Sequence, residues 1–271
     1  MKSLFFQKIV VITGSSMGIG KSMALSLARQ KAKIVINARS IDKLIATENE
    51  MKALGFDVLA VAGDVTLEED CKRLIETTIA HFGTIDILIN NAGVSMRGAV
   101  EDLSPQVIAT VFNSNAVAPY VLTKMAMPYI KKNKGSVVFI SSLAALRGLP
   151  YLSVYSSAKM ALKGLAQSLR IEHVNDGIHI GLIYIGITKI DKGKTTLGSN
   201  GTLIDLEQRD GLLANTANYV AEKIVRNIAL RKRTTVVSVT GKFYYFLVSV
   251  FPFLIELILN HSQKRLKKLY S

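Results

Sequence analysis

The sequence predicts an α/β fold, a single doubly wound parallel sheet of seven strands with helices on both faces. Two observations predict it: short apolar runs alternate with amphipathic stretches, and the first run leads directly into a cluster of glycines. The chain has 271 residues, of which 49% are apolar, enough for one large core. We expect one domain over residues 1–241 and an apolar, basic tail over residues 242–271.

Seven short runs have the composition of strands that are buried on both faces. The first, residues 8–13, reads K-I-V-V-I-T. Such a run is typical of a parallel strand, because helices on both sides leave it no solvent face. The expected strands are 8–13, 33–38, 57–62, 85–89, 136–140, 178–184 and 235–239.

Helical segments with recognisable start signals separate these strands. Ser40 is placed to cap one helix, and the sequence T-L-E-E that begins at Thr66 has the capping-box pattern. Ser104 stands before a proline in the first turn of another helix. The expected helices are 18–31, 40–54, 66–81, 104–131, one that carries Tyr155, and 215–231.

The formal net charge is +14, which suits a polyanionic small molecule, an anionic membrane surface or nucleic acid. The basic residues are scattered without interleaved aromatics, so we expect no nucleic-acid partner. The single cysteine, Cys71, excludes an intrachain disulfide, and neither it nor the four histidines show metal-ligand spacing, so we expect no metal. The first residues lack the features of an export signal, which predicts a cytoplasmic protein.

The sequence T-G-S-S-M-G-I-G at residues 13–20 stands between the first strand and the first helix. Glycines there let the backbone approach a pyrophosphate, and the helix N-terminus directs free N–H groups at the anion. A plain tight turn is the alternative, but the position between strand and helix favours a dinucleotide. The expected cofactor contacts in this turn are Gly14, Ser15, Ser16, Gly18, Ile19 and Gly20.

The second strand leads into Arg39 and Ser40, at a point where NAD sites carry an acidic residue for the ribose 2′-hydroxyl. Arg39 suits a 2′-phosphate instead, because its guanidinium pairs with phosphate oxygens in a forked geometry. A solvated surface arginine is the alternative. The expected cofactor is therefore NADP(H), with Ser40 beside it. The tips of the third and fourth strands reach the same edge of the sheet and add the expected contacts Asp64, Val65, Asn91, Ala92 and Gly93.

Several motifs occur together and in order: T-G-S-S-M-G-I-G at 13–20, D-V at 64–65, N-N-A-G at 90–93, Asn115, Ser142 and Y-S-S-A-K at 155–159. Together they resemble the short-chain dehydrogenase/reductase (SDR) superfamily, with its Rossmann-like fold, over about residues 8–240. The A-R-S sequence after the second strand and the apolar tail resemble the membrane-associated hydroxysteroid dehydrogenase branch and its ketodihydrosphingosine reductase relatives.

The resemblance implies that Tyr155 is the catalytic acid/base of a ketone–alcohol interconversion in which the cofactor supplies the hydride. Lys159 would bind the nicotinamide ribose and favour tyrosinate, because a nearby cation lowers a tyrosine pKa from its usual value of about 10. Ser142 would donate a hydrogen bond to the substrate oxygen. Asn115 would hold a water that links Lys159 to solvent.

After the sixth strand the family usually has Pro-Gly followed shortly by threonine, whereas this chain has Ile185-Gly186-Ile187-Thr188. Gly186 and Thr188 are still expected to contact the cofactor, and the isoleucine leaves the local backbone geometry open. The polar, glycine-bearing stretch 189–212 is expected to cover the substrate.

Residues 243–259 form an apolar run that Pro252 and Glu256 interrupt and that basic residues at 264–268 follow. The run is short for a spanning helix, which needs about 20 apolar residues. Two interpretations stay open. One is a helix on an anionic membrane surface, which suits a lipophilic substrate; the other is contact with a sister subunit in a homodimer or homotetramer.

The leading hypothesis is an NADP(H)-dependent oxidoreductase that interconverts a lipophilic ketone and a secondary alcohol, with peripheral attachment at the inner face of a membrane left open. One alternative is a 3-oxoacyl reductase of fatty-acid synthesis, whose acidic carrier-protein substrate suits a basic surface. Another is a non-catalytic nucleotide-binding protein that docks on a membrane.

Overall fold

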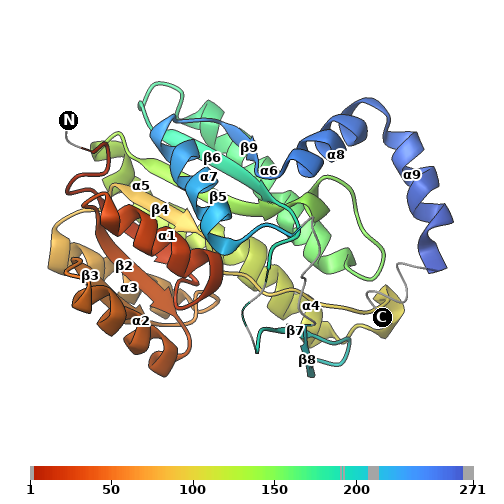
Figure 1. Cartoon of the computed structure of the whole chain (residues 1–271), viewed down its shortest axis with the longest axis horizontal. Helices are drawn as coiled ribbons and strands as arrows, with labels where there is room; N and C mark the ends of the chain where they lie inside the picture. Colours follow the sequence, from red (N-terminus) through yellow and green to blue (C-terminus); the bar gives the residue numbers. More distant parts are fainter. Residues whose placement is uncertain (1–2, 190, 192, 207–213, 265–271) are drawn as a thin grey trace.

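The computed structural model of the chain describes residues 3–189, 191, 193–206 and 214–264. Its main sheet has seven parallel strands in the order β3-β2-β1-β4-β5-β6-β9, which confirms the predicted fold class (Figure 1). The order reverses direction next to β1, between β1 and β4, as in doubly wound folds. The strands are β1 (Ile9–Thr13), β2 (Lys33–Ala38), β3 (Val58–Ala62), β4 (Ile87–Asn90), β5 (Ser136–Ser142), β6 (His179–Ile185) and β9 (Thr234–Val236).

Helices cover both faces of this sheet, and alternate residues of each strand face opposite layers. Val10 and Ile12 of β1 join one core cluster, which includes α1 and α7, whereas Val11 joins the cluster on the other face, with α3, α5 and α6. The helices are α1 (Gly18–Arg29), α2 (Ile41–Ala53), α3 (Glu68–Phe82), α4 (Pro105–Phe112), α5 (Ala118–Lys132), α6 (Ser153–Glu172) and α7 (Ala217–Ala229).

The single helix expected over 104–131 is interrupted by a π-helical turn, η2 (Asn113–Val117), between α4 and α5. Asn115 lies in this turn, and its Nδ2 donates to the carbonyls of Val111 and Val94 at 2.9 and 2.6 Å. The side chain of Asn115 thus donates to the carbonyl of Val111, four residues earlier, which in a regular α-helix would accept from the backbone N–H of residue 115. Such π-turns are often found at functional sites.

The capping box expected at Thr66 is wrong. Helix α3 begins at Glu68, with Leu67 at the N-cap, and Thr66 instead donates from its N and Oγ1 to Asp64 Oδ1 at 2.9 and 2.8 Å. Because the hydroxyl of Thr66 is hydrogen-bonded to the carboxylate of Asp64, it does not cap the helix. The cap at Ser104 is confirmed, because its Oγ accepts a hydrogen bond from Val107 N at 3.3 Å.

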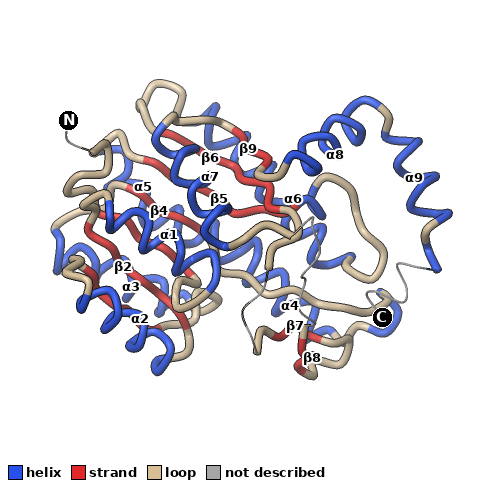
Figure 2. The backbone as a smooth tube through the Cα atoms, viewed as in Figure 1, coloured by secondary structure: helices blue, strands red, loops and turns tan. Residues whose placement is uncertain are grey.

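The stretch expected as an irregular substrate loop contains a small antiparallel hairpin, β7 (Thr195–Leu197) with β8 (Leu203–Asp205). Figure 2 shows the hairpin near α4, away from the main sheet, and Ser104 N donates to Ser199 O at 2.9 Å between them. Residues 207–213 of that expected loop lie outside the described residues.

The tail forms two helices, α8 (Val239–Val250) and α9 (Pro252–His261), which meet at an angle of 113°. The last strand ends at Val236, three residues before its expected end, because Val239 already begins α8. Among the described residues no single helix is long and apolar enough to cross a membrane, although this bent pair has the length and composition when taken together.

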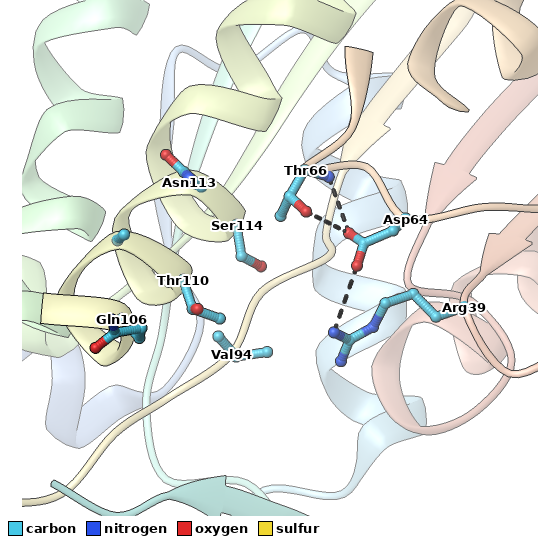
Figure 3. Close-up of a pocket in the computed structure, with 9 residues that line it drawn as sticks. Arg39, Asp64, Thr66, Val94, Gln106, Thr110, Asn113 and Ser114 are labelled. Carbon is cyan, nitrogen blue, oxygen red and sulfur yellow. Dashed lines mark hydrogen bonds and ion pairs between the residues drawn. The ribbon is translucent and has the colours of Figure 1, made fainter. Parts of the chain in front are cut away.

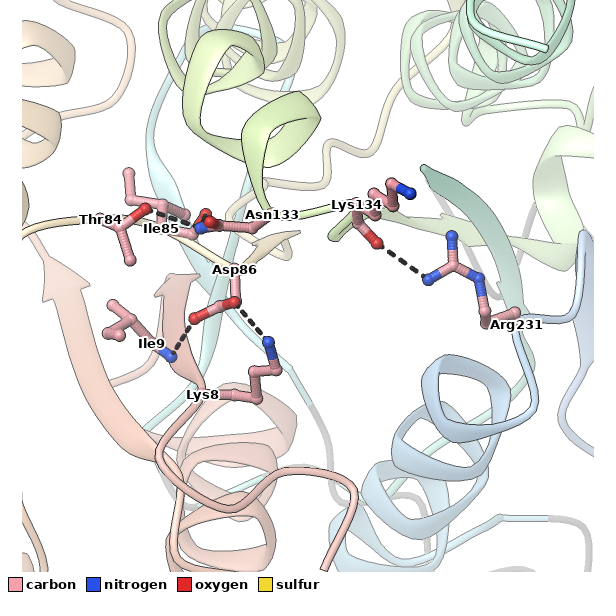
Figure 4. A network of polar contacts seen from close by, with 8 residues as sticks. All are labelled: Lys8, Ile9, Thr84, Ile85, Asp86, Asn133, Lys134 and Arg231. Carbon is pink, nitrogen blue, oxygen red and sulfur yellow. Dashed lines mark hydrogen bonds and ion pairs between the residues drawn. The ribbon is translucent and has the colours of Figure 1, made fainter. Parts of the chain in front are cut away.

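At the amino edge of the sheet, the buried carboxylate of Asp86 ties two strands together (Figure 4). It accepts hydrogen bonds from Lys8 Nζ at 2.7 Å and from Ile9 N at 2.9 Å. Arg231 binds the carbonyl of Lys134 at 3.0 Å on the same edge. These contacts fix the amino edge of the sheet, whereas ligands of open α/β sheets bind beyond the carboxyl ends of the strands.

Candidate active site

The glycine turn after β1 has a backbone that only glycine fits. Gly14 and Gly18 have φ of +63° and +57°, values that other residues adopt at a steric cost. A Cβ on Gly20 would lie 2.2 Å from the carbonyl oxygen of Gly14. The turn therefore folds tightly at the N-terminus of α1.

The residues after β4 hold this turn in place. Asn91 Nδ2 donates to the carbonyls of Thr13 and Gly14, both at 2.9 Å. Thr13 Oγ1 accepts hydrogen bonds from the backbone N of Asn91 and of Ala92, both at 3.0 Å. Thr13 belongs to the glycine motif but not to the expected cofactor contacts, and these bonds give it a positioning role in the turn.

Several residues expected to contact the cofactor direct their side chains into the protein. Ser15 is fully buried, donates to Ile12 O at 2.7 Å and accepts from Asn37 N at 3.0 Å. Ile19 packs on the core cluster of α1, and Val65 is buried in the opposite cluster. If these residues meet a cofactor, they do so through their backbone.

The first N–H of α1 is already hydrogen-bonded. Gly18 N donates to Asp191 Oδ2 at 2.8 Å, a contact between residues 173 positions apart. Ser16 uses its carbonyl to accept from Thr47 Oγ1 at 2.9 Å, which fixes the turn to α2. Asp191 was not predicted, because it lies in an irregular segment with no motif.

Beyond the ends of β2 and β3 lies a cavity of about 240 Å³, and Arg39 and Asp64 line it (Figure 3). Arg39 Nη1 is 3.6 Å from Asp64 Oδ2, and the arginine side chain is 63% exposed. Ser40 is also exposed, at the N-cap of α2. The cavity wall opposite Arg39 comes from α4, η2 and Val94, which lies in the loop after β4.

Asn115, Gly93 and Lys159 meet at one buried point. Asn115 is fully buried, and its Oδ1 has no hydrogen-bond partner in the part of the chain that the structure describes. A Cβ on Gly93 would lie 2.3 Å from this Oδ1 and 3.2 Å from Lys159 Nζ. A buried acceptor without a partner is costly and marks a place for water or a ligand.

Lys159 is buried, and its Nζ donates to the carbonyl of Ile140 at 2.9 Å. Burial lowers the pKa of its amine to about 8, because charge is disfavoured away from water. Tyr155 lies one helical turn earlier on α6, with its ring centroid 6.0 Å from Lys159 Nζ. At pH 7 most of the amine still carries its proton, so a cation stands beside the tyrosine.

Ser142 ends β5, two residues after Ile140, whose carbonyl binds Lys159 Nζ. Its Oγ accepts a hydrogen bond from Ala144 N at 3.2 Å and caps a short 3-10 turn, η3 (Leu143–Ala145). Because the oxygen acts as the acceptor there, the hydroxyl proton is still available for donation.

Ile185, which replaces the usual proline, pairs with Ser142 as the last residue of β6, so the strand starts and ends one residue later than expected. Gly186 follows in a tight space, where a Cβ would lie 3.1 Å from Leu143 Cδ1. Thr188 is nearly buried and donates to Gly186 O at 3.2 Å. Gly186 thus lies beside the residue that follows Ser142, at the same edge of the sheet.

The tail borders this edge of the sheet. A Cβ on Gly241, in the first turn of α8, would lie 3.0 Å from Leu143 Cδ1, and the rings of Tyr184 and Tyr245 are 5.9 Å apart. Much of the tail's apolar surface is nevertheless exposed. The exposed large apolar residues of α8, of α9 and of the residue between them include Phe243, Phe246, Phe251, Phe253, Leu254, Leu257 and Ile258.

Comparison with known proteins places this arrangement in a family. The family model for short chain dehydrogenase matches residues 8–198. The 11-beta-hydroxysteroid dehydrogenase-like 2 of Arabidopsis thaliana is 32% identical over 96% of this chain and 84% of its own length. The 11-beta-hydroxysteroid dehydrogenase-like 4A of the same plant is 39% identical over 68% of this chain, a match that spans only 64% of that relative.

Solved structures show the same fold with either nicotinamide cofactor. An alcohol dehydrogenase from Thermococcus sibiricus complexed with 5-hydroxy-NADP is 25% identical, with a TM-score of 0.74 over 84% of this chain and 95% of its own. A short chain dehydrogenase/reductase from Burkholderia phymatum in complex with NAD is 22% identical, with a TM-score of 0.81 over 92% of this chain and 95% of its own. With the family model, the glycine turn and these relatives in agreement, the chain belongs to the short-chain dehydrogenase/reductase family of oxidoreductases and resembles its hydroxysteroid dehydrogenase-like members.

Proposed function

We propose that the protein is an NADP(H)-dependent oxidoreductase that interconverts a ketone and a secondary alcohol, with Tyr155 as the acid/base. The observation that carries the proposal is the buried meeting point of Asn115 Oδ1 and Lys159 Nζ over Gly93, one helical turn from Tyr155. A buried lysine and an acceptor without a partner are costly in a purely structural role. A path for protons between solvent and Tyr155 gives a function to both groups, the Lys159 amine and Asn115 Oδ1.

Tyr155 would donate its hydroxyl proton to a ketone oxygen during reduction and take it back from the alcohol during oxidation. Lys159, whose Nζ lies 6.0 Å from the Tyr155 ring centroid, stabilises the tyrosinate that remains, because a nearby cation favours the charged phenolate. Ser142 donates to the same substrate oxygen, where negative charge develops. Reduction leaves Tyr155 one proton short, so Lys159 supplies the proton that restores it, and a water bound to Asn115 Oδ1, which acts as the acceptor, delivers a proton from solvent to Lys159.

The residues present fit a dinucleotide. The glycine turn has no room for a Cβ at Gly20, and the N-terminus of α1 presents backbone N–H groups with a favourable dipole. Arg39, at the end of β2, has the chemistry to pair with a 2′-phosphate. When bound, the nicotinamide supplies the hydride. Solved relatives carry NADP or NAD, so the preference for NADP(H) rests on Arg39.

A lipophilic substrate and a membrane surface fit the tail. The apolar residues exposed on α8 and α9 lie on helices that border the active-site edge, and the positive charge of the chain favours anionic lipid.

Flotation with phosphatidylglycerol vesicles tests whether the protein binds a membrane surface. The wild type should float with the vesicles, and Phe253→Asp should release the protein from them. Ile171→Asp, an equally exposed apolar position on α6, is the control. If the wild type does not float and instead forms a dimer or tetramer that Phe253→Asp dissociates, the tail contacts a sister subunit.

Turnover by the purified full-length chain tests the chemistry. Loss of NADPH absorbance is followed with a panel of ketones of increasing size and with a 3-oxoacyl thioester. Tyr155→Phe should abolish turnover while NADPH still binds, because the ring stays and only the proton donor is removed. Full activity in this variant would overturn the proposal. Tight NADPH binding without turnover on the whole panel would favour the non-catalytic alternative, and a preference for the thioester would favour the 3-oxoacyl reductase.

The cofactor assignment has its own test. Arg39→Ala should weaken NADPH binding at least tenfold and leave NADH binding nearly unchanged, because a bidentate charged pair to the 2′-phosphate is lost. Lys43→Ala on α2, which removes a neighbouring positive charge, is the control. Equal affinities for the two cofactors before and after the change would mean that Arg39 does not bind the 2′-phosphate.

A further inference from the structure

Three segments meet at the amino edge of the main sheet, where they lead into β5, β6 and β9. The segments are residues 131–135, 173–178 and 230–233. Arg231 joins all three, because its guanidinium donates to the carbonyl of Lys134 at 3.0 Å (Figure 4) and to the carbonyl of Gly177. Arg170 of α6 holds the third segment through the carbonyl of Arg233. Basic residues that lie about a hundred positions apart in the sequence therefore share one surface.

Exposed cations on these segments form no ion pair among the residues that the structure describes. They make up a basic patch of Lys132, Lys134, Lys232 and Arg233. Asp176, on the middle segment, is already paired with Lys131 at 3.0 Å, and Glu172 is the acidic residue at the end of α6. Burial lowers the pKa of Arg170, and the positive charge of Arg233 lowers it further, as expected where cations lie close together. The patch therefore carries an excess of positive charge.

Helix capping explains only part of this arrangement. A cation near a helix C-terminus is favoured by the helix dipole, and Arg231 binds carbonyls there. Lys134 and Arg231 have φ of +48° and +47°, however, a backbone conformation that glycine adopts without steric cost. The side chains of Lys232 and Arg233 make no hydrogen bond within the described residues, so they cap nothing there. Their charges are free to meet an anion from outside the chain.

The surroundings of the patch favour a protein as the source of that anion. Val174 and Leu230, on two of the three segments, are 69% and 53% exposed and offer the apolar contacts that protein interfaces use. The three segments contain no Phe, Tyr or Trp on which nucleic-acid bases could stack. The apolar tail leaves the carboxyl end of β9, whereas the patch precedes its amino end (Figure 1). A membrane bound through the tail would thus leave the patch for a soluble partner.

We propose that the basic patch is a docking surface for an acidic segment of another protein. Carboxylates of the partner pair with the cations of the patch, and its apolar side chains pack on Val174 and Leu230. The patch is separated from the carboxyl edge of the sheet by the length of β6, seven residues or about 20 Å. A docked partner therefore leaves the proposed cofactor cleft open, and it recruits the protein without delivering a substrate.

The test uses the full chain and a fluorescein-labelled decaglutamate peptide as the acidic probe. Fluorescence anisotropy gives the dissociation constant for the wild type and for two double variants, Lys132→Glu/Lys134→Glu and Lys232→Glu/Arg233→Glu. Each should bind the peptide about tenfold more weakly, because two attractive contacts become repulsive. Lys43→Glu/Lys72→Glu, which changes exposed lysines on α2 and α3, has the same net charge and should keep most of the affinity. Thermal melts followed by circular dichroism check that every variant folds.

Three results would overturn the proposal. Equal losses of affinity in all three double variants would mean that the peptide responds only to net charge. Release from phosphatidylglycerol vesicles by the patch variants, but not by Phe253→Asp, would make the patch a lipid surface. Tighter binding of a decauridylate than of the peptide, lost in the same variants, would make it a nucleic-acid surface. NADPH turnover should be unchanged in both patch variants, so the docking surface and the proposed reaction are tested separately.

Discussion

Arg147, on the loop between Ser142 and Tyr155, forms an ion pair with Glu256 of α9, 109 residues further along the chain. The two residues also line a cavity of about 560 Å³ between this loop and α9. Tyr244 of α8 lies close by, where burial raises the pKa of its hydroxyl and the Arg147 charge lowers it. The tail is therefore attached to the segment that joins the two proposed catalytic residues.

Charge reversal tests whether this ion pair holds α9. Arg147→Glu places two carboxylates opposite each other, and chymotrypsin should then cleave the exposed aromatic residues of the tail several-fold faster. The double variant Arg147→Glu/Glu256→Arg should restore slow cleavage. The pair is partly exposed, so its coupling in the free energy of unfolding should be only about 0.2–1 kcal/mol. Equal cleavage rates in all three proteins would show that other contacts hold α9.

The fold was predictable from the sequence because its signals are local. A strand buried on both faces is a continuous apolar run, as residues 9–13 show, and a tight glycine turn needs glycine at fixed positions. Ser104 was identified as a cap because its partner, Val107 N, is three residues away. The same reasoning failed at Thr66, because the carboxylate of Asp64 competes for its hydroxyl.

Most of the site was reached through resemblance, and the contacts that the sequence did not indicate join distant residues. Asn115 is indicated by its place in the family pattern, but its side-chain bond to Val94 O joins residues 21 positions apart. The contact of Asp191 with Gly18 spans 173 residues and follows no spacing rule. Hairpin β7–β8 has only three residues in each strand, too few for a recognisable alternation.

The glycine turn predicts a contrast between two Gly→Ala substitutions. Gly20→Ala places a Cβ 2.2 Å from the carbonyl oxygen of Gly14, and should destabilise the fold by about 1–3 kcal/mol and abolish NADPH binding. Gly164→Ala, at an exposed position inside α6 with no atom within 4 Å of the new Cβ, should stabilise by about 0.5–1 kcal/mol and leave binding intact. Urea midpoints measure both effects. A similar loss of stability in the two variants would contradict the tight geometry of the turn.

The buried His179 predicts how stability changes with pH. Burial lowers the pKa of its imidazole to about 4, with the charges of Arg231 and Arg170 acting in the same direction and the carbonyl of Lys232 opposing them. The unfolded chain binds this proton from pH 6.5 downward, whereas the folded chain resists it until about pH 4. The contribution of neutral His179 to the free energy of unfolding is therefore fully present above pH 6.5 and is lost as the pH falls toward 4. The loss is on the order of 3 kcal/mol.

The comparison that isolates this effect is between His179→Gln and His81→Gln, which removes an exposed histidine. In the folded wild type, His179 Nε2 lies 2.9 Å from Lys232 O and Nδ1 lies 3.2 Å from Ser136 Oγ, so Nε2 must donate and Nδ1 accepts. A second proton on Nδ1 would remove that acceptor inside the core. The free energy of unfolding from urea titrations between pH 4 and 7.5 should therefore fall less steeply toward acid in His179→Gln than in the wild type and in His81→Gln. Parallel curves for all three proteins would show that His179 takes up its proton equally in the folded and unfolded chain.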